Sequence, residues 1–373
     1  MDPPVKPGSL APNLSRDGDT VLLTWLEPPH PKVKPQEGNY ALRFSRFEQG
    51  RWSAPATIAS GTDFFANWAD FPSVTASSDG RLLIAHWAAK SGSDTYAYDV
   101  RLARSEDRGR SWTPMGPAHD DRTKTEHGFV SAVPEERAVR LFWLDGRATA
   151  TKGPMALRTA RVERAIGPSE LLDPKVCDCC QTGAAGTSGG FAVVYRDRSD
   201  REVRDISVVR GTSGRWSAPR TVFADGWQID GCPVNGPAID ADGDLVAAAW
   251  FSQAQDRPRI EVAFSKDGAA TFGHPFALDA AEPLGRVDVA IDGRGDAIVA
   301  WVASVPPKDA AIRLVRVSPN GRIGAPVTVA PTSTARASGF PRIERAGDRL
   351  VVVWVEANEP SRLRAAVLPL TAL

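Results

Sequence analysis

The stretch Leu245-Val246-Ala247-Ala248-Ala249-Trp250 is a short apolar run that ends on an aromatic residue. The pattern occurs seven times at spacings of 51–62 residues, and the runs end at Trp25, Trp87, Trp143, Tyr195, Trp250, Trp301 and Trp354. A regular period of this kind, built from short strands, is typical of a β-propeller. Nearly continuous apolarity predicts strands that are buried on both faces. The sequence therefore predicts an all-β, seven-bladed β-propeller of four-stranded blades.

The other parts of the unit also repeat. Asp-Gly pairs such as Asp79-Gly80, Asp242-Gly243 and Asp292-Gly293 precede several of the runs and predict hairpin turns. The segment Arg51–Pro55 recurs almost unchanged as Arg215–Pro219, which indicates duplication. The last unit ends after its third strand, so we expect the segment before Ser9 to supply the missing fourth strand and close the ring. We expect a single domain over residues 1–373, with blades at about 9–60, 61–118, 119–173, 174–224, 225–278, 279–330 and 331–373.

Composition excludes several classes of partner. Hydrophobic residues make up 42% of the chain, and its 45 Lys and Arg balance its 45 Asp and Glu. The chain has no net positive charge that would favour binding to nucleic acid or to an anionic membrane. No run approaches the roughly 20 apolar residues of a membrane span. We expect a monomer with a small ligand.

One segment carries a family resemblance. Ser105-Glu106-Asp107-Arg108-Gly109-Arg110-Ser111-Trp112 resembles the Asp-box, or BNR repeat, of sialidases (neuraminidases) and related propellers. The segment Ser265–Phe272 resembles a degenerate copy in the same register. The resemblance implies a sialidase-like propeller over the whole chain. Together with the polar, proline-rich opening segment Asp2–Pro7, it implies a periplasmic or extracellular protein.

The resemblance does not extend to the catalytic motifs. Sialidases close six blades and carry an Arg-Ile-Pro segment, three arginines that hold the sugar carboxylate, a Tyr–Glu nucleophile pair and an Asp acid/base. Here the repeat count is seven and Arg-Ile-Pro does not occur. The residues to test for these roles are Arg196, Arg286, Arg342, Tyr96, Tyr98 and Tyr195.

The most unusual local sequences contain the four cysteines. Cys177, Cys179 and Cys180 lie within Val176–Thr182, and Cys232 lies within Trp227–Pro237. Both segments occupy the connection into the first strand of a blade, in consecutive units. First strands line the central channel, so the four cysteines are expected to meet at the channel mouth.

Three interpretations of the cysteines stay open. The first is a disulfide from Cys232 to one of the other three, which adjacent inner strands can accommodate. The second is a thiolate site for copper or zinc, because soft thiolates select Cu(I) and Zn²⁺. The third is a reactive thiol.

Equivalent connections bring further side chains to the same face. The side chains on this face are Trp68, Trp227, Asn67, Asn235, Arg147 and those of the mixed-charge run 196–205. His127 is the histidine that the repeat places near the cysteines, which makes it a candidate fifth ligand. Carboxylates to test in glycoside chemistry are Asp70, Glu126, Asp145 and Asp230.

The sequence thus favours a secreted propeller whose top-face cluster of Cys177, Cys179, Cys180, Cys232 and His127 binds a soft metal, with copper favoured over zinc. One alternative is a glycoside hydrolase that acts on sialic acid or another acidic sugar. Another is a non-catalytic protein-interaction scaffold. The catalytic residues, if any, are unassigned among Asp70, Glu126, Asp145, Asp230, Arg196 and Arg286.

Overall fold

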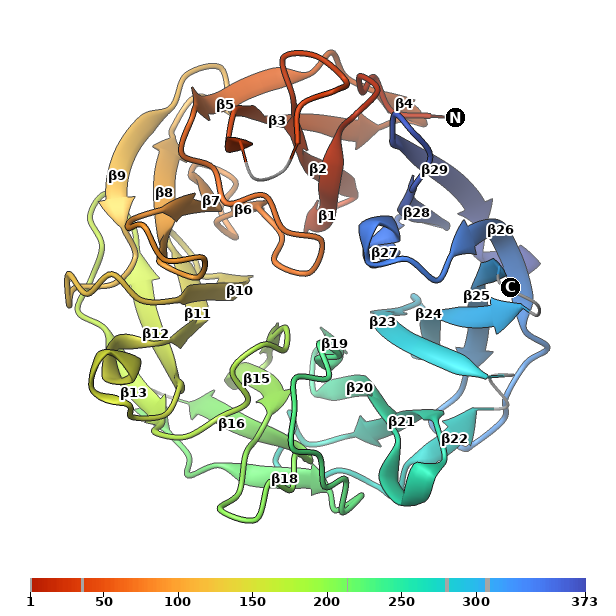
Figure 1. Ribbon diagram of the computed structural model, residues 1–373. Helices are drawn as coiled ribbons and strands as arrows, with labels where there is room; N and C mark the ends of the chain where they lie inside the picture. The colour runs from red at the N-terminus through yellow and green to blue at the C-terminus, as the bar shows by residue number, and fades with distance from the viewer. Residues whose placement is uncertain (1, 35–36, 213, 279–281, 306–308) are drawn as a thin grey trace.

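Seven antiparallel sheets surround a central channel in the computed structural model (Figure 1). It describes residues 2–34, 37–212, 214–278, 282–305 and 309–373. Each of the seven aromatic runs forms the second strand of its sheet. The predicted seven-bladed β-propeller is therefore confirmed.

The first four blades contain eighteen strands. Blade 1 is β1 (Leu10–Asp17), β2 (Thr20–Glu27), β3 (Tyr40–Glu48), β4 (Arg51–Trp52) and β5 (Ala56–Gly61). Blade 2 is β6 (Ser73–Ala76), β7 (Leu83–Lys90), β8 (Tyr98–Ser105) and β9 (Thr113–Pro117). Blade 3 is β10 (His127–Pro134), β11 (Val139–Asp145), β12 (Ala156–Val162) and β13 (Glu170–Asp173). Blade 4 is β14 (Gly183–Thr187), β15 (Gly190–Arg196), β16 (Ile206–Thr212), β17 (Arg215–Trp216) and β18 (Arg220–Phe223).

The last three blades complete the ring. Blade 5 is β19 (Ala238–Asp242), β20 (Leu245–Ser252), β21 (Arg259–Ser265) and β22 (Phe276–Leu278). Blade 6 is β23 (Pro283–Ile291), β24 (Ala297–Val305), β25 (Asp309–Val317) and β26 (Val327–Ser333). Blade 7 is β27 (Arg342–Ala346), β28 (Arg349–Glu356) and β29 (Arg362–Pro369). Short 3₁₀ turns are η2 (Arg147–Thr151), η3 (Ala254–Asp256), η4 (Arg336–Ser338) and η5 (Leu370–Ala372). The boundary expected at residue 279 falls outside the described residues.

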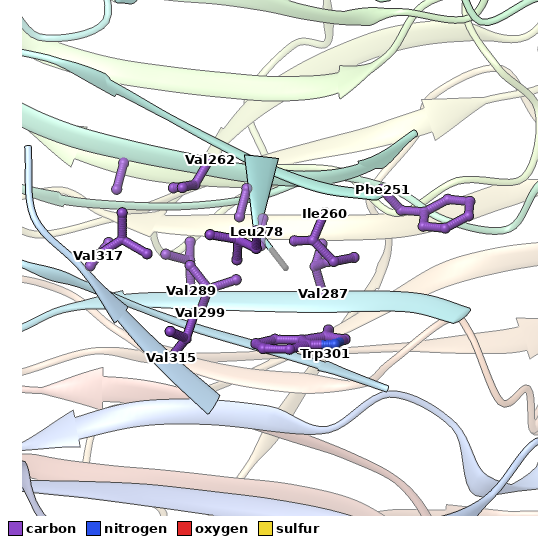
Figure 2. Packing of buried hydrophobic residues seen from close by; sticks show 14 of the residues in the cluster. Phe251, Ile260, Val262, Leu278, Val287, Val289, Val299, Trp301, Val315 and Val317 are labelled. Atoms are coloured by element: carbon purple, nitrogen blue, oxygen red, sulfur yellow. The ribbon is translucent and has the colours of Figure 1, made fainter. Parts of the chain in front are cut away.

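The core consists of apolar layers between neighbouring blades. Between blades 5 and 6, Ile260 and Val262 face Val289 and Val299, with Trp301 at the edge of the layer (Figure 2). Burial of both faces explains why the second strands are apolar without alternation. Among the described residues, no helix is long and apolar enough to cross a membrane.

Carboxylates on first strands join consecutive blades by accepting hydrogen bonds from the backbone of the next blade. Asp240 Oδ2 accepts the backbone N–H of Ile291 in the next blade at 2.7 Å. Asp288 Oδ2 accepts the N–H of Ile343 in the following blade at 2.8 Å. A buried backbone donor without a partner is costly, so these contacts hold the first strands in register around the channel.

The N-terminal segment lies along the last blade. The Gly8 N–H donates to the Ser361 carbonyl at 2.8 Å, and Asp2 pairs with Arg364 at 2.9 Å. The expectation that this segment supplies the fourth strand of blade 7 is wrong: residues 2–9 form no strand, and blade 7 has three strands among the described residues. Contacts of the segment with Ser361 and with β29 close the ring instead.

The turn after β8 shows how the segment that resembles an Asp-box works. Asp107 Oδ1 accepts the Ser111 N–H at 2.9 Å, and the Ser105 hydroxyl accepts the Gly109 N–H at 2.8 Å. Gly109 has φ of 86°, a conformation that glycine adopts without steric cost. Turns of this type lie on the face opposite the connections that carry the cysteines, because neighbouring strands are antiparallel.

Candidate functional site at the channel mouth

Irregular backbone gathers where the first strands begin. Left-handed φ values occur at Ala11 (52°), Phe129 (54°), Val234 (48°) and Arg286 (57°). Three of these residues lie at register shifts in β1, β10 and β23. Bulges and non-glycine residues at positive φ cluster at functional sites, where the surrounding structure holds them. The channel mouth is therefore the place to look for chemistry.

The two cysteine segments meet at this mouth, as the repeat predicted. Cys179 and Cys232 form a disulfide with their Cα atoms 6.1 Å apart. Gln181 adds two polar contacts: its Nε2 donates to the Ala69 carbonyl at 2.7 Å, and its Oε1 accepts the Gly236 N–H at 2.9 Å. The connections into blades 2, 4 and 5 are thus tied together at one point.

Behind the disulfide lies a buried pair of thiols. Cys177 and Cys180 are free, 0% and 2% exposed, and their sulfurs are 3.1 Å apart and share a hydrogen bond. Arg204 Nη1 donates to Cys177 Sγ at 3.2 Å. The sulfurs of Cys177, Cys179 and Cys180 all lie within 4.8 Å of one another.

The surroundings of this thiol pair separate the two pKa values. The hydrogen bond from Cys180, the N–H of Cys179 and the cations Arg196 and Arg204 lower the pKa of Cys177 to about 6, against the effect of burial. Burial and the adjacent Cys177 raise the pKa of Cys180 well above its ordinary value. Of the two thiols, Cys177 is therefore the one that loses its proton more readily.

Part of the mixed-charge run 196–205 forms the wall of this cluster. Arg198 pairs with Asp178 at 3.0 Å and with Glu202 at 2.9 Å. Glu202 also pairs with Arg204 at 2.8 Å. These contacts hold the loop after β15 against the cysteine segment and aim the Arg204 guanidinium at Cys177.

Tyr98, Glu126 and Asp70 form a second cluster at the mouth. The Tyr98 hydroxyl donates to Glu126 Oε1 at 3.0 Å. A Cβ on Gly128 would lie 2.2 Å from Asp70 Oδ2 and 2.8 Å from the Tyr98 oxygen, so this glycine allows both groups to approach. The structure thus brings together two of the carboxylates and one of the tyrosines that the sequence nominated.

Burial controls the titration of both carboxylates. Removal from water raises the pKa of Asp70 to about 7. Burial also raises the pKa of Glu126 to about 7, and the charges of Asp70 and Asp178 add to the effect. Asp178 lies between the flanking cysteines Cys177 and Cys179, so this acidic cluster and the cysteine cluster are electrostatic neighbours.

His127 belongs to a different network from the cysteines. Its Nε2 lies 3.1 Å from Asp121 Oδ2 and 3.8 Å from Asp145 Oδ1. Its ring stacks on His119 with centroids 3.6 Å apart and planes at 6°. Parallel imidazoles at this spacing cannot direct in-plane lone pairs at one ion, and Arg147 already neutralises Asp145 at 2.7 Å. This network is better explained as a polar joint between blades 2 and 3.

The nominated arginines use their donors on the protein itself. Arg196 donates to the carbonyls of Asn235, Arg204 and Phe251, and its guanidinium lies 4.7 Å from the centre of the Trp227 ring. Arg286 donates to the carbonyls of Thr334, Ala335 and Gly339. Arg342 pairs with Asp288 at 3.4 Å in the channel wall, and Asp230 is exposed in the loop before Cys232.

A cleft of about 670 Å³ lies beside the mouth. Aromatic side chains line it at Phe65, Trp68 and Tyr96, together with the polar Asn67 and Asp94. Phe65 stacks on Tyr98 with ring centroids 4.1 Å apart, so the cleft adjoins the Tyr98–Glu126 pair. Tyr96 is 60% exposed and offers a free aromatic face.

Comparisons with known proteins concern the fold. An α-L-arabinanase of Penicillium chrysogenum, solved with arabinobiose, matches with a TM-score of 0.52 at 13% identity, over 100% of this chain and 97% of that chain. An ulvan lyase, solved with a sugar ligand, matches with a TM-score of 0.64 at 8% identity, over 98% and 94% of the two chains. A Hadza microbial sialidase matches with a TM-score of 0.51 at 13% identity, over 92% and 75%.

The chain shares the β-propeller fold of these proteins. Likeness at these identities establishes the fold and not an activity. No protein-family model and no curated protein sequence matches the chain.

Gly236 tests the junction between the two cysteine segments. A Cβ there would lie 2.1 Å from the Gln181 carbonyl oxygen, so Gly236→Ala is expected to lower the free energy of unfolding by at least about 2 kcal/mol. Gly231→Ala, in the same loop, meets only Ile229 at 3.9 Å and is expected to change it by no more than about 0.5 kcal/mol. Equal effects in denaturant titrations of both variants would contradict the proposed junction.

The raised pKa values near 7 of Asp70 and Glu126 predict a pH-dependent stability. A carboxyl whose pKa is raised in the folded state makes its full contribution to the free energy of unfolding below its unfolded-state pKa of about 4. That contribution is lost as the pH rises towards the folded-state value of about 7. The difference in free energy of unfolding between Asp70→Asn and wild type should therefore shift by about 2–3 kcal/mol in favour of the variant when the pH is raised from 5 to 8. The exposed control Asp230→Asn should show no such difference. Parallel pH profiles for Asp70→Asn and wild type would rule out the buried carboxylate.

Proposed function

We propose that the cysteine cluster at the channel mouth binds a soft metal ion, with Cu(I) as the principal ion and Zn²⁺ as its competitor. The observation that carries the proposal is the buried Cys177–Cys180 pair, with sulfurs 3.1 Å apart and Arg204 directed at one of them. The disulfide beside it fits an oxidising compartment, which supports a periplasmic or extracellular location.

Distance and donor type support the metal interpretation. A thiolate–metal bond is about 2.3 Å, so two sulfurs on one ion are separated by at most about 4.6 Å. The free sulfurs of Cys177 and Cys180 are 3.1 Å apart, which is within that limit. A set of sulfur donors alone selects soft ions over Mg²⁺ or Ca²⁺.

Charge and burial support the same interpretation. Two or three thiolates on a monovalent ion leave a net negative charge, which a buried site tolerates only beside cations. Arg204 contacts Cys177, and Arg196 lies close enough to act on both thiols. Burial would also shield Cu(I) from water and oxidants.

The ligand count favours copper over zinc. Structural zinc sites are almost always four-coordinate. The nominated histidine, His127, is held among aspartates, and Asp178 is paired with Arg198. Two or three sulfurs without a fourth donor suit Cu(I).

Copper titration tests this proposal. Protein purified without reductant or metal should bind about one Cu(I) in competition with a chromogenic chelator. Cys177→Ser and Cys180→Ser should each lose at least about tenfold in affinity, because each removes one of two sulfur donors. His127→Gln should bind like wild type. Unchanged affinity in both serine variants would contradict the site, and loss in His127→Gln would move it to the histidine network.

A second candidate is glycoside hydrolysis, in the manner of an exo-sialidase acting on acidic sugars. The Tyr98–Glu126 hydrogen bond beside Asp70 and the adjoining aromatic cleft favour it. The arabinanase, ulvan lyase and sialidase that share the fold add support by analogy. A carboxyl with a pKa near 7 suits a general acid at neutral pH.

The arginines count against a sialoside. The guanidinium groups of Arg196 and Arg286 donate to backbone carbonyls, and Arg342 is paired with Asp288. A three-arginine clamp for a sugar carboxylate is not formed by these nominated residues. A neutral sugar stacked on Tyr96 suits the cleft better.

Fluorogenic sialoside, glucuronide and arabinofuranoside substrates test the second candidate. If the Tyr98–Glu126 pair acts in hydrolysis, Glu126→Gln should lower kcat by at least about a hundredfold. The exposed Asp230→Asn should retain the wild-type rate. No turnover of any of the three substrates, or equal rates in both variants, would count against hydrolysis.

A further inference from the structure

The disulfide and the thiol pair lie in layers. Cys232 is exposed, Cys179 is half-buried, and Cys177 and Cys180 are buried beneath them. A reagent in solution therefore meets the Cys232 sulfur first. The sulfur released when the bond breaks, that of Cys179, is the one that lies within 4.8 Å of both buried sulfurs.

The loop that carries Cys232 is held at both ends by hydrogen bonds that do not involve the disulfide. One end is fixed by the Ile229 N–H, which donates to the Glu202 carbonyl at 3.0 Å. The other end is fixed by Asn235, whose Oδ1 accepts the Arg286 N–H at 2.8 Å and whose carbonyl accepts from Arg196. Breaking the disulfide therefore frees the tip around Cys232 and leaves both ends attached.

We propose that Cys179–Cys232 is an exchangeable disulfide, opened at Cys232 by a dithiol reductant, and that opening delivers Cys179 as a third sulfur to the Cys177–Cys180 pair. The second half of this inference rests on the soft-metal function proposed above. The closed protein offers two sulfurs to the ion and the open protein offers three. Redox state thus sets the affinity for Cu(I).

The exchange balances without a further reactant. One thiolate of the dithiol attacks Cys232 Sγ and forms a mixed disulfide, and the electron pair of the broken bond leaves with Cys179 Sγ. The second thiol of the reductant then attacks its own mixed disulfide and releases the Cys232 thiolate. The reductant becomes a cyclic disulfide, its two protons are available to the two cysteines, and the protein gains two electrons.

Dithiothreitol is a suitable probe. After reduction under native conditions the far-UV spectrum should be unchanged. Because Cys177 and Cys180 are buried, thiols are counted by alkylation of quenched samples in denaturant; the count should rise from two to four, with Cys179 and Cys232 identified as the new thiols by peptide mapping. Once dithiothreitol has been removed under anaerobic conditions, Cu(I) affinity measured by chelator competition should rise at least about tenfold. Opening that occurs only together with unfolding would overturn the exchange.

Two variants separate this inference from the metal proposal. Cys232→Ser leaves Cys179 permanently free and should bind Cu(I) tightly without reductant. Cys179→Ser keeps the buried pair and should bind with the weaker affinity in both redox conditions. If reduction gives four thiols but the wild-type protein binds Cu(I) equally well before and after reduction, the proposed coupling of the disulfide to copper affinity is overturned and the metal site itself is not. No copper binding in either state, despite correct thiol counts, would instead show that the metal proposal has failed.

Discussion

The second strand of each of the seven blades is apolar on both faces, so both faces have to be shielded from water. A ring of blades meets this requirement because each second strand packs between two neighbouring sheets, as Ile260 and Val262 pack against Val289 and Val299. The rest of the structure depends on this closure. It fixes which connections share a face, and it brings segments from consecutive blades to one channel mouth.

The sequence could predict the ring and the meeting of the two cysteine segments, because both follow from the repeat. It could not predict the pairing of Cys179 with Cys232, because the direction of each side chain within Cys-x-Cys-Cys depends on local backbone angles. His127 shows the same limit: the repeat placed it on the correct face, but its ring turns towards Asp121 and His119. Arg204 was hidden in a mixed-charge run in which nothing marked one arginine as the partner of a thiol. Gln181, in contrast, follows Cys180 directly and could have been noticed as a part of the motif.

Two clusters with different chemistry share the mouth. The cysteine cluster has sulfur donors and nearby cations. The Tyr98–Glu126–Asp70 cluster has carboxyl groups whose pKa burial raises to about 7. Asp178 connects them, since it pairs with Arg198 on the cysteine side and its charge acts on Glu126. A metal ion with its thiolates would therefore alter the electrostatic environment of the carboxylates, and the two proposed functions are not independent.

The location of bound copper tests the central claim most directly. Crystals of the protein loaded with Cu(I) and measured on both sides of the copper absorption edge would place the ion by its anomalous signal. The account predicts a single strong peak between the sulfurs of Cys177 and Cys180. A peak between His119 and His127, or no ordered copper at the channel mouth, would contradict it.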